Sequence, residues 1–271
     1  MSVIPFHITA LLYFVSTLVY IAYLVSHKQK ILYIGRGVLI GAFSLHTVTI
    51  ILRWVDAGRT PAVNLYEALT VLAWIIVCLS IVADVRYKLA IIGSFTSPVA
   101  LLLLLTASFL PREIVPLAPA LMSYWLPVHV TLALLGNAFF ILAFLMGAMY
   151  LIQERHLKKR KIGGLYYLLP SLEILDELNY RALTYGFPLL TLAMITGAIW
   201  AGYVWGSYWS WEPRQAWSLI TWFLYAALLH GRITAGWRGR KAAIFSAIGV
   251  AVLLGSFLAI NLLYRGKHGF L

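Results

Sequence analysis

The chain has 271 residues, of which 62% are hydrophobic and 11% are charged. A typical soluble domain is about 45–50% apolar and about 25% charged, so this composition excludes an ordinary soluble fold, a disordered chain and a coiled coil. The single cysteine, Cys78, excludes an internal disulfide and any dithiol chemistry within the chain. Because the apolar residues form long runs, we predict an all-α polytopic membrane protein and not a β-barrel.

The net charge of +12 does not indicate a nucleic-acid-binding protein. The Lys and Arg residues stand in short runs between apolar segments, which is typical of cytoplasmic loops of membrane proteins. We therefore expect membrane lipid, and no nucleic acid, around the chain.

Eight apolar segments are long enough to cross a bilayer, which takes about 20 residues. They lie near residues 5–26, 32–53, 66–83, 89–109, 126–151, 183–204, 216–232 and 243–264. If the N-terminus is outside, most of the 21 basic residues fall in inside loops. We therefore predict about eight transmembrane helices in a single domain over residues 1–271, with both termini outside.

The largest inside loop, residues 152–182, has two parts. It begins with the basic run 155–161 and continues with apolar residues at 172, 174, 175 and 178, separated by acidic ones. This spacing predicts a short amphipathic helix on the inner membrane surface between the fifth and sixth spans. An ordinary connector fits the loop equally well.

The outer segment 203–217 concentrates the aromatic residues. It contains Trp205, Trp209, Trp211 and Trp217, and with Trp222 these make half of the chain's ten Trp residues. Tryptophan is common at membrane interfaces, so an anchoring belt is one interpretation. A helical turn through Trp205 and Trp209 would place both on one face. Such an apolar surface suits a flat aromatic ligand.

This segment carries a resemblance to a known family. The pattern Trp-Gly-x-x-Trp-x-Trp-Glu-Pro over residues 205–213, with the later Trp217, Trp222 and His230, resembles the Trp-rich WWD segment of haem-handling cytochrome c assembly proteins. The similarity is greatest to their CcsA/ResC branch, and residues 53–67, 123–129, 236–242 and 266–269 resemble other parts of it.

Three positions depart from the family pattern. Glu212 replaces the usual Asp, and Arg214-Gln215 replaces the usual Lys-Glu after the proline, so that a carboxylate is lost at Gln215.

The resemblance implies a role in system II cytochrome c biogenesis. It implies haem b as cofactor, export of the haem to the outer face, and presentation there for attachment to an apocytochrome c with a CxxCH motif. The implied partners are a ResB/CcsB-like membrane subunit and thiol-reducing proteins, and the implied location is the inner (cytoplasmic) membrane with a periplasmic active face. Whether the chain is a haem lyase (holocytochrome c synthase) component is left open, and no catalytic residue is assigned.

The resemblance also implies ligands. His129 and His268 correspond to the histidines that hold an outer haem iron, and His230 corresponds to a ligand of an inner haem whose second ligand lies on a partner subunit. The aromatic contacts would come from the outer segment, namely Trp205, Trp209, Trp211 and Trp217 with Glu212. Independently of the resemblance, the span count places His129, the Trp-rich segment and His268 on one side of the membrane.

Two further charged or ionisable positions stand out in the first half. His46 is the only intramembrane alternative within the chain for the inner site, but it lies near the outer end of its span and His230 near the inner end, so we do not favour that pair. Glu67, at the outer entrance to the third span, is expected to pair with Arg53 or Arg59.

Two other functional classes remain open. A HemX-like membrane regulator of haem biosynthesis resembles this chain in size, but it need not retain two outer histidines. A secondary transporter would show interrupted helices and polar residues at the membrane midplane.

Overall fold

A computed structural model describes residues 2–114, 116, 122–160 and 163–263, with the backbone alone described for residues 257–263. Every regular element in these ranges is helical. The chain forms two compact units, the first made of Met1–Ile114 and Ile152–Ser171 and the second of Val115–Leu151 and Leu172–Leu271.

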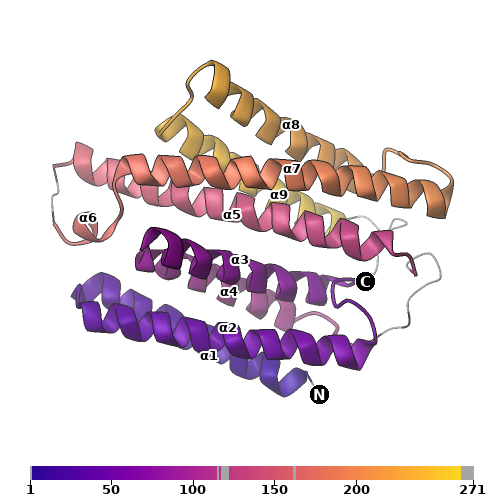
Figure 1. Cartoon of the computed structure of the whole chain (residues 1–271), viewed down its shortest axis with the longest axis horizontal. Coiled ribbons are helices and arrows are strands. Elements are labelled where there is room, and N and C mark those ends of the chain that lie inside the picture. Colours follow the sequence, from indigo (N-terminus) through magenta and orange to yellow (C-terminus); the bar gives the residue numbers. More distant parts are fainter. Residues whose placement is uncertain (1, 115, 117–121, 161–162, 264–271) are drawn as a thin grey trace. The chain divides into compact units, whose positions relative to one another are not determined.

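Unit 1 is an antiparallel helical bundle (Figure 1). Its helices are α1 (Val3–Ser26), α2 (Gln29–Ala57), α3 (Leu65–Tyr87) and α4 (Gly93–Ser108), with the 3₁₀ turn η1 (Ala90–Ile92) before α4 and the single-turn α6 (Leu165–Leu168). Helix α1 packs against α2 and α4, and α3 packs against α4. Consecutive helices therefore bring the N-terminus of α1 and the C-terminus of α2 to the same end, where the main-chain N–H of Ser2 donates to Asp56 (3.1 Å).

Unit 2 contains α5 (Trp125–Lys158) as far as Leu151, together with α7 (Leu172–Trp205), α8 (Pro213–Thr234) and α9 (Arg240–Leu263). These helices also alternate in direction, since contacts join the start of α5 to the end of α7 and the start of α7 to the end of α8. One end of unit 2 thus carries the start of α5 and the α7–α8 loop. The other end carries the start of α7 and the α8–α9 loop.

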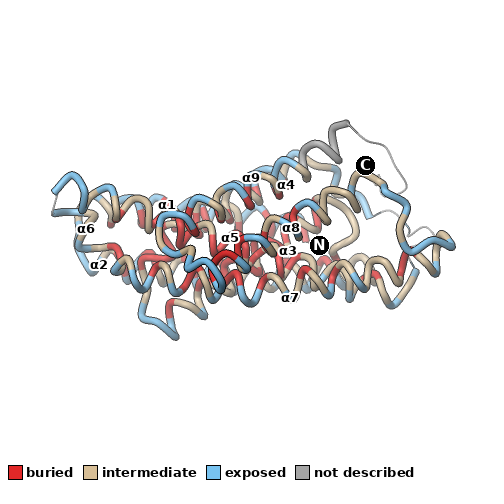
Figure 2. The backbone as a smooth tube through the Cα atoms, turned by 90° about the horizontal axis from the view of Figure 1, so that it is seen from above, coloured by how far each residue is buried: buried red, intermediate tan, exposed pale blue. Residues whose placement is uncertain are grey.

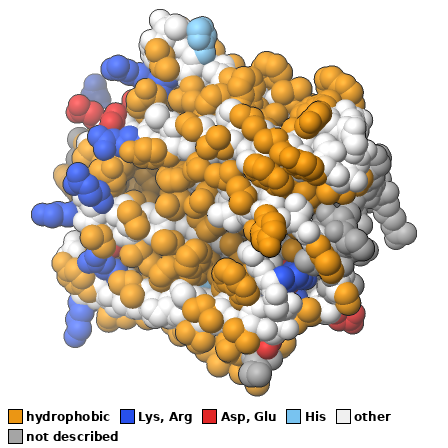
Figure 3. Space-filling model, turned by 45° about the vertical axis from the view of Figure 1, so that its right-hand side comes forward, with side chains coloured by type: hydrophobic (Ala, Val, Ile, Leu, Met, Phe, Trp, Pro, Cys, Tyr) orange, Lys and Arg blue, Asp and Glu red, His pale blue; other side chains and the backbone are white. Residues whose placement is uncertain are grey.

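Helix α1 shows the burial expected in a lipid environment. Its buried side chains are mostly polar, namely Thr9, Tyr13, Ser16, Thr17, Tyr20 and Tyr23, with Phe6 the apolar exception. Its outward face is apolar and includes Ile4 (72% exposed), Leu11 (58%) and Val25 (75%). Figure 2 shows this alternation along the chain, and hydrophobic side chains dominate the face in Figure 3. Hydrocarbon around the bundle makes this arrangement favourable, because the polar groups find partners only inside it.

The predicted multi-pass α-helical architecture is confirmed. Six of the described helical segments, α1, α2, α3, η1 with α4, α5 and α7, are long and apolar enough to cross a membrane. Helices α8 and α9 coincide with the last two predicted spans.

The predicted short surface helix does not form a separate element. Residues 172–178 are helical and bury Leu175 and Leu178, but they are the first turns of the 34-residue helix α7. No glycine or proline interrupts the chain between Leu178 and Leu183, so the helix continues directly into the span. The helix that does lie in the predicted loop is the four-residue α6.

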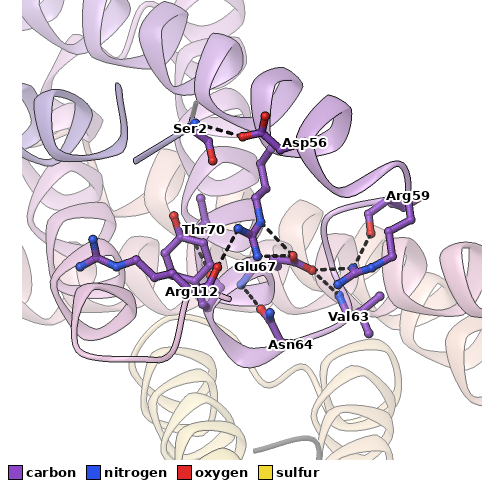
Figure 4. Close-up of polar contacts among 11 residues, drawn as sticks. Ser2, Asp56, Arg59, Val63, Asn64, Glu67, Thr70 and Arg112 are labelled. Atoms are coloured by element: carbon purple, nitrogen blue, oxygen red, sulfur yellow. Dashed lines mark hydrogen bonds and ion pairs between the residues drawn. The ribbon is translucent and has the colours of Figure 1, made fainter. Parts of the chain in front are cut away.

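One end of unit 1 holds a buried ion network (Figure 4). The Glu67 side chain is fully buried, and its Oε1 accepts from Arg53 Nε (3.0 Å) while its Oε2 accepts from Arg59 Nη1 (2.9 Å) and the Val63 N–H (3.1 Å). The side chain of Asn64 caps α3 by accepting from the Glu67 N–H at 2.8 Å. The expected pairing is therefore confirmed, and Glu67 pairs with both arginines.

The orientation of the chain in the membrane is open to a direct test. Reporter fusions after residues 26, 158 and 238 are expected to report the cytoplasm, and fusions at residues 60 and 208 the outer compartment, because basic loops are retained inside. Compartment-specific enzyme reporters read the two outcomes. A cytoplasmic signal at residue 208 would contradict the predicted orientation.

Candidate functional site

His129 lies at the start of α5, and its imidazole is embedded against the last turns of α7. Its Nδ1 lies 2.7 Å from the main-chain oxygen of Ala193. The ring occupies the space above Gly197, where an added Cβ would lie 2.6 Å from His129 Cε1. Trp200, one turn further along α7, stacks near the imidazole with ring centroids 6.4 Å apart and planes at 24°. Three residues on successive turns of α7 thus define the place of one histidine.

The contact with Ala193 fixes the tautomer of His129. A carbonyl oxygen only accepts hydrogen bonds, so the Nδ1 that lies against it carries the proton and donates. In the neutral imidazole the other ring nitrogen, Nε2, then keeps its lone pair. Metal-ligating histidines have this arrangement, in which a carbonyl orients one nitrogen while the other binds the metal.

The Trp-rich segment begins where α7 ends. Helix α7 stops at Trp205, and Gly206 follows with φ +72°, a left-handed conformation that glycine adopts without steric cost. Residues 207–212 form an irregular loop before α8. The expectation that Trp205 and Trp209 share one helical face is therefore wrong, because Gly206 turns the chain out of the helix between them.

The indoles of this segment do not form one flat surface. Trp200 and Trp205 meet edge to face with centroids 5.0 Å apart and planes at 63°, and Trp209 and Trp211 meet at 5.7 Å and 86°. Edge-to-face contact is the arrangement that the aromatic quadrupole favours. The Trp209 Nε1 is buried and has no hydrogen-bond partner among the described residues, while Trp211 is 71% exposed.

Two of the residues that depart from the family pattern lie where the loop meets α8. Glu212 is the N-cap residue of α8, with Pro213 in its first turn. The Gln215 side-chain oxygen accepts from the Ser210 main-chain N–H at 2.8 Å, which closes the loop onto the first turn of α8. An amide oxygen fulfils this acceptor role as a carboxylate would, so the substitution at Gln215 does not remove the loop contact.

Trp217 and Trp222 extend the aromatic cluster along α8. Trp217 is half-buried in the second turn of that helix. The Trp222 Nε1 donates to Thr191 Oγ1 on α7 at 2.9 Å, and its ring packs against Phe187. Trp222 therefore fixes α8 against α7, which is a structural role.

His230 lies toward the opposite end of unit 2 from His129. It follows Pro213 by 17 residues along α8, which is about 25 Å at 1.5 Å per residue. Its side chain is exposed. His268 lies outside the described residues, and His46 belongs to unit 1, where it is fully buried with its Nδ1 3.0 Å from the Tyr13 hydroxyl.

A buried ion pair next to His230 was not found from the sequence. Arg232 donates to both carboxylate oxygens of Asp176 on α7 (2.9 and 2.7 Å), and its guanidinium lies over the Tyr180 ring. Asp176 also accepts from the Gly239 N–H at 2.7 Å. One carboxylate therefore ties α7, α8 and the start of α9 together. In the sequence Arg232 resembled an ordinary loop cation, and Asp176 did not stand out beside the acidic residues Glu173 and Glu177.

The backbone at Gly206 gives a prediction for stability. We expect Gly206→Ala to lower the free energy of unfolding by about 1–2 kcal/mol, because an L-residue with φ near +72° is strained. Gly255→Ala in α9 is the matched control, since an added Cβ there meets nothing within 4 Å. Unfolding in detergent compares the two variants. Equal stabilities would show that the loop adopts another conformation.

Comparison with known proteins identifies the family. The sequence model described as Cytochrome C assembly protein matches residues 62–268. The cytochrome c biogenesis protein CcsA of Guillardia theta is 37% identical over 286 aligned residues, which cover 97% of this chain and 94% of that protein. The CcsA protein of Microcystis aeruginosa is 38% identical over 266 residues, covering 80% of this chain and 81% of that protein.

The fold agrees with a solved structure of a cytochrome c haem lyase, CcmF. The match has a TM-score of 0.73 at 15% identity and covers 95% of this chain but 46% of that one. At this identity the likeness concerns the fold. The sequence comparisons confirm the resemblance carried by the Trp-rich segment, and the chain belongs to the cytochrome c assembly protein family.

Proposed function

We propose that this chain binds haem b at the outer face of the inner membrane and presents it for attachment to apocytochrome c. The observation that carries the proposal is the convergence of His129 and the Trp-rich segment at one end of unit 2. They come from α5 and from the end of α7, 74 and more residues apart in sequence, and contact each other through Trp200. A membrane anchor needs no such histidine.

The residues present fit a haem group. His129 has the tautomer in which Nε2 keeps the lone pair that binds iron. Trp209 offers a buried indole N–H without a partner among the described residues, which suits one of the two carboxylates of haem. Exposed rings at Trp211 and Tyr208 provide apolar contact area for the macrocycle or for the incoming protein.

His268 is proposed as the second outer ligand. Helix α9 runs from the end of unit 2 that holds Gly239 toward the end that holds His129, and His268 follows its last residue by five positions. At the opposite end, the exposed His230 is proposed as the ligand of an inner haem, with its second ligand from a ResB/CcsB-like subunit. The complete burial of His46 between α1 and α2 favours a structural role for that residue.

The chain's own residues would bind and orient, and the cofactor would bring the reactive groups. Bound haem supplies the two vinyl groups to which cysteine thiols add. His129 would hold the iron and the surrounding indoles would exclude water from the macrocycle. The thiols must come from the CxxCH motif of the apocytochrome, kept reduced by partner proteins, because Cys78 is the only cysteine here. Whether the chain acts as a holocytochrome c synthase or as a carrier depends on its contribution to that addition.

Two other classes are less well supported. A secondary transporter would have span helices interrupted by unwound segments, whereas α1 to α5 and α7 to α9 are each continuous over their described lengths. A HemX-like regulator of haem synthesis would not require the tautomer-fixing contact at His129.

A maturation assay tests the proposal. In cells that lack the endogenous gene, the wild-type chain is expected to restore holocytochrome c, measured by haem staining of separated proteins, and His129→Ala is expected to fail. The His156→Ala variant is the control, since the hydrogen bond of His156 among the described residues is to Ile152 of its own helix, at the other end of α5. Full maturation with His129→Ala would contradict the proposal, and altered haem-precursor levels with normal holocytochrome would favour the regulator.

A further inference from the structure

We infer that Gly197 and the main-chain carbonyl of Ala193 are positioning groups for the His129 imidazole, and that they hold it in the single orientation and tautomer needed for iron binding. This inference rests on the proposed function of His129. It concerns two positions on α7 that have no polar or aromatic side chain.

The absence of a side chain at Gly197 is a steric requirement. An added Cβ would lie 2.6 Å from His129 Cε1 and 2.7 Å from Nδ1, closer than Cβ atoms approach other atoms in proteins. The imidazole therefore fills the volume that any other residue at position 197 would occupy. Gly197 does not have a positive φ, so backbone conformation does not explain the glycine.

The Ala193 carbonyl accepts the hydrogen bond that orients the His129 ring. It lies one turn before Gly197 on α7, and the displacement of the ring toward the helix axis brings Nδ1 within 2.7 Å of its oxygen. The Thr196 hydroxyl approaches the same oxygen at 3.1 Å, in addition to its bond of 2.8 Å to Leu192. Ala193 is 2% exposed, so little water competes for the contact.

The two contacts depend on each other. With a larger residue at position 197, the ring would have to move away from α7, and the hydrogen bond to Ala193 would lengthen or break. Nδ1 and Nε2 would then compete for the proton, and the ring would lose its contact with Trp200. Loss of the group that hydrogen-bonds the non-ligating nitrogen of a metal-binding histidine lowers metal affinity about 10- to 100-fold.

The experiment compares Gly197→Ala with Gly249→Ala, a matched control in the same unit. An added Cβ at Gly249 would meet the Tyr225 ring and hydroxyl at 2.6 Å, so both variants introduce a similar steric conflict, but only one of them involves His129. Both proteins are purified in mild detergent without haem. Nitrogen-15 NMR of labelled histidines reports the tautomer, with the His129 signals assigned from their loss in His129→Ala.

We expect the Nδ1–H tautomer in the wild type and in Gly249→Ala, and a mixture in Gly197→Ala. In titrations with ferric haem followed by absorbance, Gly197→Ala is expected to bind about 10- to 100-fold more weakly than Gly249→Ala. We also expect Gly197→Ala to lower the thermal stability of the protein. This loss should disappear in a His129→Ala background, because the steric conflict of the added Cβ is with the His129 ring.

The outcomes separate this inference from the proposed function. A wild-type tautomer and haem affinity in Gly197→Ala would overturn the positioning role. The positioning role would also be overturned if Gly197→Ala destabilised the protein equally in a His129→Ala background. If the wild type binds no haem while Gly197→Ala still changes the tautomer, the proposed function fails and the positioning of His129 stands.

Discussion

Glu67→Ala is expected to lower the free energy of unfolding by about 3–5 kcal/mol, because it leaves Arg53 and Arg59 without their shared carboxylate. Glu67 is 1% exposed and Arg53 is 7% exposed, so water does not replace the lost partner. Arg53 also donates to the Arg112 carbonyl, which links the end of α2 to the chain after α4. Loss of Glu67 would thus loosen one whole end of unit 1.

Glu177→Ala provides the control for this prediction. Glu177 pairs with Arg181 one turn along the exposed side of α7, where both side chains are about half exposed. Pairs of this kind contribute about 0.3–0.5 kcal/mol. Unfolding in mixed detergent measures both variants. An equal loss in the two would mean that the Glu67 network is hydrated and that its burial is not maintained in the membrane.

Replacement of His230 is expected to remove haem from the protein while leaving its stability almost unchanged. The side chain is exposed, so truncation leaves no buried cavity or unpaired group, and surface substitutions usually change stability by less than about 0.5 kcal/mol. If haem enters at the inner end, His230→Ala also deprives the outer site. His129→Ala should differ, because it retains haem at the inner end.

The comparison that tests this prediction is the haem content per folded protein of His230→Ala, His129→Ala and the control His156→Ala, together with their thermal midpoints. Normal haem content in His230→Ala would contradict an inner ligand role. A lowered midpoint with normal haem would assign His230 a structural role.

The helices were predictable from the sequence, but their lengths were not. The apolar runs located the eight long helices of the described residues, yet α5 and α7 each have 34 residues, about 50 Å, and extend well beyond a hydrocarbon core of about 30 Å. Their extra turns lie in polar sequence. Ion pairs at i,i+4, Glu154 with Lys158 and Glu177 with Arg181, support these turns and leave no mark in a hydropathy pattern.

The candidate site was predictable in its parts and not in its geometry. Span counting placed His129 and the Trp-rich segment on the same side, and unit 2 brings them together at one end. The roles proposed for Gly197 and Ala193 depend on which face of α7 meets α5, and no motif in the sequence encodes that contact. The pairing of Arg232 with Asp176 was not predicted either, because 56 residues separate the partners and only the packing of α7 against α8 brings them together.

The most direct test of the account is the haem-to-protein ratio of the wild-type chain purified in mild detergent from haem-replete cells. The account predicts a Soret band and a pyridine haemochrome spectrum of haem b, with a lower ratio in His129→Ala that added imidazole partly restores. Wild-type protein that is folded and free of haem under these conditions would contradict it.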